Sequence, residues 1–177
     1  MVTRAAVFRK VLILVFKIGF GDLSSRNDEV GIKRSQGYIH GLIDAEVSSG
    51  IPSNRIVLGG FSQGGAISLF SGITATKKLG GIVGLSCYLL MHDKFKESIP
   101  ADSPNKDTPI FMGHGEVDPL VLPKWGQLTK ETSTNEGHKV ELKFYPGLAH
   151  SADPDEIDDV EKFLNERIPP LGDKQSL

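Results

Sequence analysis

The sequence predicts an α/β domain in which a mainly parallel β-sheet is flanked by helices. Short apolar runs rich in Val, Ile, Leu and Phe alternate along the chain with segments whose apolar residues recur at helical spacing. Strands joined by helices pack as right-handed crossovers, so this alternation favours a parallel sheet. The length of 177 residues, with 39% hydrophobic and 24% charged residues, suits one globular domain with its own core.

Composition argues against several classes of function. The formal net charge is -2 and the basic residues are scattered along the chain, so we expect no nucleic-acid partner. Cys87 is the only cysteine, which rules out an internal disulfide and a zinc site built from several thiolates. We expect neither a metal nor a cofactor.

The first apolar run, at residues 11–16, is predicted to be a buried strand. It ends at Lys17 and is far shorter than the ~20 apolar residues that cross a bilayer. Basic residues precede it, as in a signal peptide, but no small-residue cleavage site follows. Residues 1–15 are otherwise unassigned. The main domain is expected to span residues 16–170, with a polar tail at 171–177.

A helix is predicted at about residues 28–48, after a turn and a polar segment at residues 19–27. Gly50 stands where this helix should end. The apolar positions that recur at three- and four-residue spacing are Val30, Tyr38, Ile39, Leu42, Ile43 and Val47.

Strands are predicted at residues 56–58, 79–85, 109–112 and 140–145, and a further helix at residues 123–135. Residues 91–107 carry prolines and charges without periodicity, which indicates a loop with at most a short helix.

The last helix has the clearest predicted boundaries. Asp153 can cap it, Pro154 suits its first turn, and Pro169 and Pro170 stop it. Its predicted buried face consists of Ile157, Val160, Phe163, Leu164 and Ile168. Its acidic residues, Asp153, Asp155, Glu156, Asp158 and Asp159, are interpreted as a solvated helix start that matches the helix dipole, in preference to a metal site.

The segment at residues 56–66 carries the first candidate for chemistry. An apolar strand runs into the G-x-S-x-G pattern at residues 60–64, and a helix-like sequence follows. In this strand–turn–helix elbow the glycines let the strand and the helix approach, while the serine is held exposed in a strained turn. Ser62 is therefore a candidate nucleophile.

A serine nucleophile needs a base and an acid that orients the base. In α/β-hydrolases these follow the serine in the order acid, then histidine, each after a strand. His150 follows the strand at residues 140–145, whereas the other histidines lie in a predicted helix (His40), in polar loops (His92, His138) or directly after a strand between glycines (His114). The loop at residues 113–119 offers both Asp118 and Glu116 as the acid. Asp118, followed by Pro119, is preferred because it resembles the pattern of this fold family better.

Three segments together resemble one known family. GIPSNRIVLGGFSQGGAISL (residues 50–69), GHGEVDPLV (113–121) and FYPGLAHS (144–151) are similar to the acyl-protein thioesterase and lysophospholipase group, also called the phospholipase/carboxylesterase family of α/β-hydrolases. The resemblance implies a serine hydrolase that cleaves fatty-acyl thioesters of S-acylated (palmitoylated) proteins, lysophospholipids or carboxylic esters. It implies Ser62 as nucleophile, Asp118 as orienting acid, His150 as general base and the Gln63 backbone N–H as oxyanion donor.

The same resemblance implies where such an enzyme acts and what it meets. We expect a cytoplasmic enzyme, with the nucleus as a second compartment. Its partners would be an S-acylated protein or a lysophospholipid, and we expect no transmembrane span. The sequence predicts no oligomeric state.

The sequence departs from the family pattern at its start. Family members begin with a strand and an HGLGD-like loop, whose backbone supplies a second oxyanion donor, and then a further strand. The sequence contains no such loop, so we expect the N-terminal third of the family fold to be absent. Two alternatives remain open: a catalytically impaired variant that lacks the full oxyanion hole, and an esterase for short-chain, carbohydrate or peptide esters.

Other residues receive simpler interpretations. Cys87 is predicted to be a buried core thiol. Trp125 belongs either to the core, which we prefer, or to the rim of an acyl-binding site. Residues 89–91 are candidates for the lining of an acyl channel.

Overall fold

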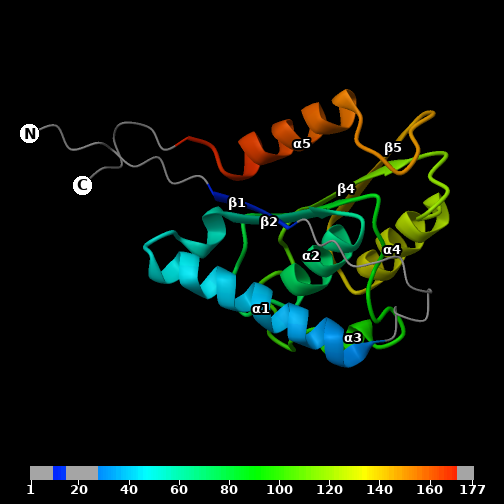
Figure 1. The fold of residues 1–177 in the computed structure, drawn as a ribbon. Helices are drawn as coiled ribbons and strands as arrows, with labels where there is room; N and C mark the ends of the chain where they lie inside the picture. Colours follow the sequence, from blue (N-terminus) through cyan, green and yellow to red (C-terminus); the bar gives the residue numbers. More distant parts are fainter. Residues whose placement is uncertain (1–9, 15–27, 171–177) are drawn as a thin grey trace, which may run out of the picture.

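Five parallel strands form one sheet in the computed structural model, which describes residues 10–14 and 28–170 (Figure 1). They lie in chain order across the sheet. The strands are β1 (Lys10–Leu14), β2 (Ile56–Phe61), β3 (Gly81–Leu85), β4 (Ile110–Gly115) and β5 (Val140–Tyr145). The predicted parallel α/β architecture is therefore confirmed. The last residues of the first predicted strand and the turn at residues 19–27 lie outside the described residues.

Helices cover both faces of the sheet. They are α1 (Glu29–Ser48), α2 (Gln63–Ile73), the short α3 (Phe95–Ser98), α4 (Pro123–Asn135) and α5 (Pro154–Arg167). Figure 1 shows α5 alone on one face and the other helices on the opposite face. Side chains of β2 alternate accordingly: Ile56 and Leu58 join the core under α1 and α2, and Val57 joins Phe163 of α5.

The boundaries of α1 follow its capping residues. Asp28 Oδ1 accepts a hydrogen bond from the N–H of Gly31 (2.9 Å), and Gly50, with φ 98°, lies just past the helix end. The buried side chains are Ile32, Ile39 and Ile43.

The predicted apolar face of α1 is partly wrong. Val30 and Tyr38 are 80% and 61% exposed. The buried side of α1 includes Ile32. Val30 lies two residues before Ile32, which is about 200° of helix rotation, so its side chain points away from this side.

The predicted buried face of α5 also needs correction. Phe163 and Ile168 are buried as expected, but Ile157 is 49% exposed and Glu156, predicted to be solvated, is fully buried. The helix is rotated so that its first turn lies over Gly113 of β4, and the space left by the missing side chain holds the Glu156 carboxyl group.

Two strands extend further than predicted, through glycines that suggested turns. β2 continues to Phe61 and β4 to Gly115, and these glycines remain paired in the ladder, for example Gly59 with Val83 and Gly113 with Leu85. Gly60 lies against the backbone of Gly64 in α2 and Gly113 against the Glu156 side chain of α5, so close packing against a helix, and not a turn, requires glycine at these two positions.

The backbone ladder continues one residue beyond each of three strands. Ser62 N–H donates to Leu85 O (2.8 Å), Ser86 N–H to Gly113 O (2.8 Å), and Glu116 N–H to Tyr145 O (3.0 Å). The residues that follow β2, β3 and β4 are therefore fixed at one edge of the sheet. Ligands bind at this carboxyl edge in open α/β sheets.

Candidate active site

Ser62 stands at a strained turn between β2 and α2. Its φ of 54° and ψ of -124° lie in a region that residues with a side chain rarely adopt. The turn is possible because the helix lies almost in contact with the strand: a Cβ on Gly60 would be 2.4 Å from the carbonyl of Gly64. The local geometry is that of the nucleophile elbow predicted from the sequence.

The structure brings Ser62, His150 and Asp118 into one hydrogen-bonded line. His150 Nε2 lies 3.0 Å from Ser62 Oγ, and His150 Nδ1 lies 2.7 Å from Asp118 Oδ2. Because a carboxylate can only accept, Nδ1 carries the proton and Nε2 is left to accept from the serine hydroxyl. The side chain of His150 is 10% exposed and that of Asp118 is fully buried.

The other oxygen of Asp118 is held by backbone. Oδ1 accepts hydrogen bonds from the N–H groups of Leu120 and Val121, both at 2.9 Å. This leaves Oδ2 directed at His150. Glu116, the alternative acid, is exposed at the surface.

Two contacts hold His150 in place, one to its ring and one to the backbone of its segment. Its centroid lies 4.8 Å from that of Phe61, the residue before Ser62. The segment that carries it is joined to the acid loop by a hydrogen bond from Val117 N–H to Leu148 O (3.1 Å). The sequence motif could not indicate Phe61, because it occupies one of the two variable positions in G-x-S-x-G.

Gln63 is the first residue of α2, so its N–H has no carbonyl partner within the helix. The partial positive charge at a helix N-terminus favours a nearby anion. This backbone group directly follows Ser62 in the chain.

The remaining histidines have separate environments. His114 is fully buried in β4, and His40 Nε2 lies 2.9 Å from Ser71 O. His138, predicted to lie in a polar loop, is only 3% exposed, and its burial lowers its pKa. Its ring lies 6.3 Å from that of Phe95, so the loop folds over an apolar neighbour.

Cys87 is buried as predicted, and burial raises the pKa of its thiol far above the usual range. A thiol in this environment stays protonated and unreactive.

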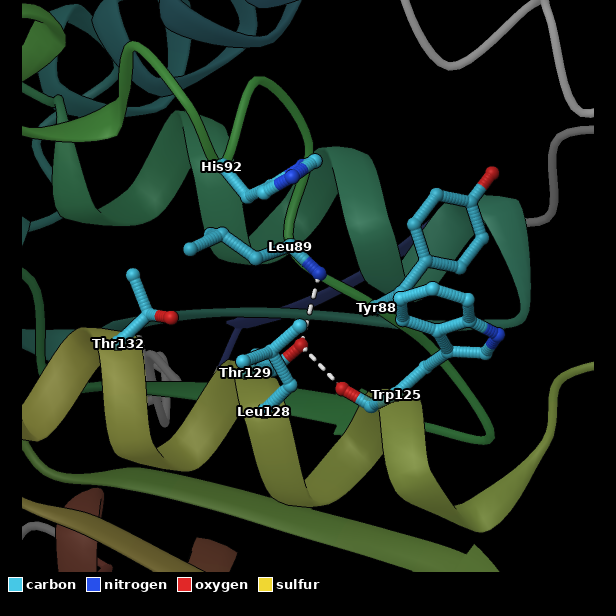
Figure 2. Close-up of a pocket in the computed structure, with 7 residues that line it drawn as sticks. All are labelled: Tyr88, Leu89, His92, Trp125, Leu128, Thr129 and Thr132. Atoms are coloured by element: carbon cyan, nitrogen blue, oxygen red, sulfur yellow. Dashed lines mark hydrogen bonds between the residues drawn. The ribbon is translucent and has the colours of Figure 1, made fainter.

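A small cavity lies between α4 and the loop after β3. Its volume is about 90 Å³. Figure 2 shows α4 side chains projecting toward the loop that carries Tyr88, Leu89 and His92. The lining residues are Tyr88, Leu89, His92, Trp125, Leu128, Thr129 and Thr132.

Trp125 is half-buried, lines the cavity and belongs to neither buried core cluster, which contradicts the preferred assignment to the core. Its place at the rim of an acyl-binding site stays a prediction. Thr129 Oγ1 joins the two walls, because it accepts from Leu89 N–H (2.8 Å) and donates to Trp125 O (2.7 Å). Leu90 and Met91 are buried in the main core, and only Leu89 of residues 89–91 lines the cavity.

Within residues 10–14 and 28–170, none of the helices combines the length and the apolar character that a membrane span needs. The same residues contain no cluster of three or more His, Cys, Asp or Glu side chains that could hold a metal ion.

A parallel sheet with helices on both faces and a serine on a strand–helix elbow defines the α/β-hydrolase fold. The chain belongs to the phospholipase/carboxylesterase family, which it matches over residues 16–168.

Curated relatives are similar over most of this chain. It is 52% identical over 152 residues to acyl-protein thioesterase 1 of Neurospora crassa and 50% identical over 153 residues to acyl-protein thioesterase 1 of Gibberella zeae. These alignments cover 86% and 85% of this chain but 62% and 65% of the relatives. The chain thus spans less than two thirds of the length of these relatives.

Solved structures share the fold. SOBER1 of Arabidopsis thaliana is 32% identical, with a TM-score of 0.75, and the match covers 80% of this chain and 66% of that one. Acyl-protein thioesterase 2 of Zea mays is 28% identical, with a TM-score of 0.69 and coverage of 80% and 66%.

Proposed function

We propose that the chain is a serine hydrolase of acyl esters and thioesters, with Ser62 as nucleophile, His150 as general base and Asp118 as orienting acid. The observation that carries the proposal is the line of hydrogen bonds from Ser62 Oγ through His150 to Asp118, at 3.0 and 2.7 Å. Three loops at the carboxyl edge of the sheet contribute one residue each. Such an arrangement activates a serine hydroxyl, which is otherwise a weak nucleophile.

In the acylation step, Ser62 Oγ attacks the carbonyl carbon of the substrate while His150 Nε2 takes the hydroxyl proton. The negative charge that develops on the carbonyl oxygen is stabilised by the Gln63 N–H at the start of α2. The buried Asp118 carboxylate stabilises the imidazolium. His150 Nε2 then gives its proton to the leaving thiol or alcohol, and an acyl-serine remains.

In the deacylation step, His150 Nε2 takes a proton from water, and the hydroxide attacks the acyl-serine carbonyl. The tetrahedral intermediate collapses, Ser62 Oγ recovers the proton, and the fatty acid leaves.

The proposed substrates are fatty-acyl thioesters of S-acylated proteins, with lysophospholipids and carboxylic esters as further candidates. Relatives named acyl-protein thioesterase 1 support the first class, and the family name supports the others. The acid loop also exposes apolar side chains next to the proposed acid: Val117, Leu120 and Leu122 are 59%, 53% and 41% exposed. These can contact an acyl chain. A single cysteine, which needs no oxidising compartment, fits a cytoplasmic enzyme.

A fluorophosphonate probe tests the proposed nucleophile. The folded chain should be labelled at one residue, and Ser62→Ala should abolish labelling. If the chain is folded but is not labelled, the proposal is wrong for this chain.

Turnover of p-nitrophenyl esters with increasing acyl length tests the substrate class. We expect faster turnover of long acyl chains. A preference for acetyl or butyryl groups would contradict the fatty-acyl part of the proposal and favour a short-chain carboxylesterase. Labelling at Ser62 together with a kcat ~10²- to 10³-fold below that of an enzyme with two oxyanion donors would instead indicate an oxyanion hole with one donor.

A further inference from the structure

His114 is a buried polar residue next to the proposed triad that the mechanism above does not use. It lies in β4, is fully buried, and its ring centroid lies 6.1 Å from that of Phe144 in β5. An apolar side chain of similar size would fill this space at a lower desolvation cost. A histidine at this position is therefore expected to make a polar contact that compensates this cost.

The hydrogen bond of His114 fixes its tautomer. Nε2 lies 2.8 Å from the carbonyl oxygen of Val121, which can only accept, so Nε2 must carry a proton. Nδ1 has no hydrogen-bond partner in the part of the chain that the structure describes. It faces α4 so closely that a Cβ on Gly126 would lie 2.7 Å from it. A proton on Nδ1 would be a buried donor without a partner, so these contacts favour the tautomer with the proton on Nε2.

The residue that accepts from His114 also holds the proposed acid. The N–H of Val121 donates to Asp118 Oδ1 (2.9 Å), and the C=O of the same residue accepts from His114. Both peptide groups of Val121 are thus fixed. His114 Nε2 also lies 3.8 Å from Asp118 Oδ2, beyond hydrogen-bond distance but close enough for the positive end of its N–H dipole to stabilise the carboxylate.

We propose that His114 is a positioning residue for Asp118: it holds the loop at residues 118–121 so that one carboxylate oxygen is bound by backbone and the other is aimed at His150 Nδ1. This inference rests on the proposed function for its effect on turnover. The effect of His114 on the position of Asp118 is inferred from the contacts alone, so it can be tested without measuring turnover.

The first experiment measures the tautomer of His114 in the folded 177-residue chain. Two-dimensional ¹H–¹⁵N NMR of the histidine side chains should show the His114 proton on Nε2, and the downfield signal of His150 Nδ1–H should report its hydrogen bond to Asp118. A proton on His114 Nδ1 instead of Nε2 would overturn the proposal.

The second experiment compares His114→Gln with His114→Met and His114→Asn. The amide nitrogen of Gln reaches the place of Nε2, whereas that of Asn matches Nδ1, and Met fills the volume without a donor. We expect His114→Met and His114→Asn to lower kcat by roughly 10- to 10²-fold, because a small displacement of a catalytic group costs that much. KM should change by less than kcat does, because Leu120 is the one exposed apolar side chain named above that lies in the loop at residues 118–121.

Rescue by Gln separates positioning from packing. His114→Gln should keep most of kcat and the downfield His150 signal, while His114→Met loses the signal with circular dichroism unchanged. The acid limb of the kcat/KM profile of His114→Met should move to lower pH, since a misaligned carboxylate stabilises the imidazolium less. Equal losses in all three variants, or full activity in folded His114→Met, would overturn the proposal.

The outcomes distinguish this inference from the proposed function. If the wild-type chain lacks Ser62-dependent turnover, the proposed function fails. The His150 signal then decides the position of Asp118: its loss in His114→Met and its retention in His114→Gln support the inference, and retention in both contradicts it.

Discussion

Glu156 places its carboxyl group over Gly113, in the space that a side chain at that strand position would fill. A Cβ on Gly113 would lie 2.4 Å from Glu156 Oε1 and 3.1 Å from Cδ and Cγ. The carboxyl group is fully buried, and neither oxygen has a hydrogen-bond partner of normal geometry in the described residues. A carboxyl group in such a place is stable mainly when neutral.

Glu156 should make the stability of the protein depend on pH. Burial, and then the negative charge of Asp153, raise the pKa of Glu156 from 4.5 to about 7, partly offset by the backbone of Asp153. The folded state therefore holds this proton more tightly than the unfolded state. Protonated Glu156 contributes about 3 kcal/mol to the free energy of unfolding. This contribution is fully present below pH 4.5, falls as pH rises, and is gone above about pH 7.

Glu156→Gln tests this dependence through urea unfolding at about pH 5 and about pH 8. The variant should gain stability relative to wild type as pH rises, because an amide does not ionise. Asp158→Asn, on the exposed side of the same helix, is the matched control. A constant difference between Glu156→Gln and wild type across this range would contradict the burial of a neutral carboxyl group.

Gly113→Ala should destabilise the fold by about 1–3 kcal/mol, because the new methyl group overlaps Glu156. The atoms it would meet all lie beyond Cβ of Glu156, so Glu156→Ala removes them. The cost of Gly113→Ala should therefore be smaller in the Glu156→Ala background. A double-mutant cycle on urea midpoints measures this coupling, and additive effects would show that the two residues do not compete for one space.

Asp118→Asn should lower kcat by ~10⁴, because an amide at this position favours the wrong tautomer of the histidine. Glu116→Gln is the control from the same loop, since Glu116 is exposed and should leave kcat unchanged. Steady-state kinetics on a thioester substrate compare the two. A large loss in Glu116→Gln and none in Asp118→Asn would reverse the assignment of the acid.

Alanine at two helical glycines should stabilise the chain. Gly37 and Gly41 lie in α1, and a Cβ at either would meet nothing within 4 Å. Each substitution should add about 0.5–1 kcal/mol, because alanine loses less backbone entropy on folding. Gly60→Ala should instead cost about 1–3 kcal/mol or more, since its Cβ would overlap the backbone of Gly64. Thermal unfolding ranks the variants, and equal effects at all three positions would contradict the contacts described.

Local chemistry made much of the fold predictable. The predicted bounds of the helix at residues 123–135 and the strand at 140–145 match α4 and β5, because proline and glycine mark their ends. The strands at β2 and β4 were predicted too short, since glycines that admit a packed helix look the same in sequence as glycines that make a turn.

Contacts between distant parts of the chain were not predictable. The burial of Glu156 depends on Gly113, and its acidic neighbours suggested a solvated helix start. The order of Ser62, Asp118 and His150 could be predicted from the elbow and the strand ends, but their distances depend on the register of the whole sheet. The hydrogen bond from His114 to Val121 had no signal in the motif.

The backbone hydrogen bonds that continue from the strands into Ser62, Ser86 and Glu116 make the loops of the site part of the sheet's cooperative unit. Their amide protons should exchange with solvent as slowly as those of β3 and β4, through global unfolding and not through local opening. We therefore expect Ser62 and the start of the loop that carries Asp118 to keep their positions until the sheet itself unfolds. Heat or denaturant should abolish labelling of Ser62 and the sheet's circular dichroism in one transition.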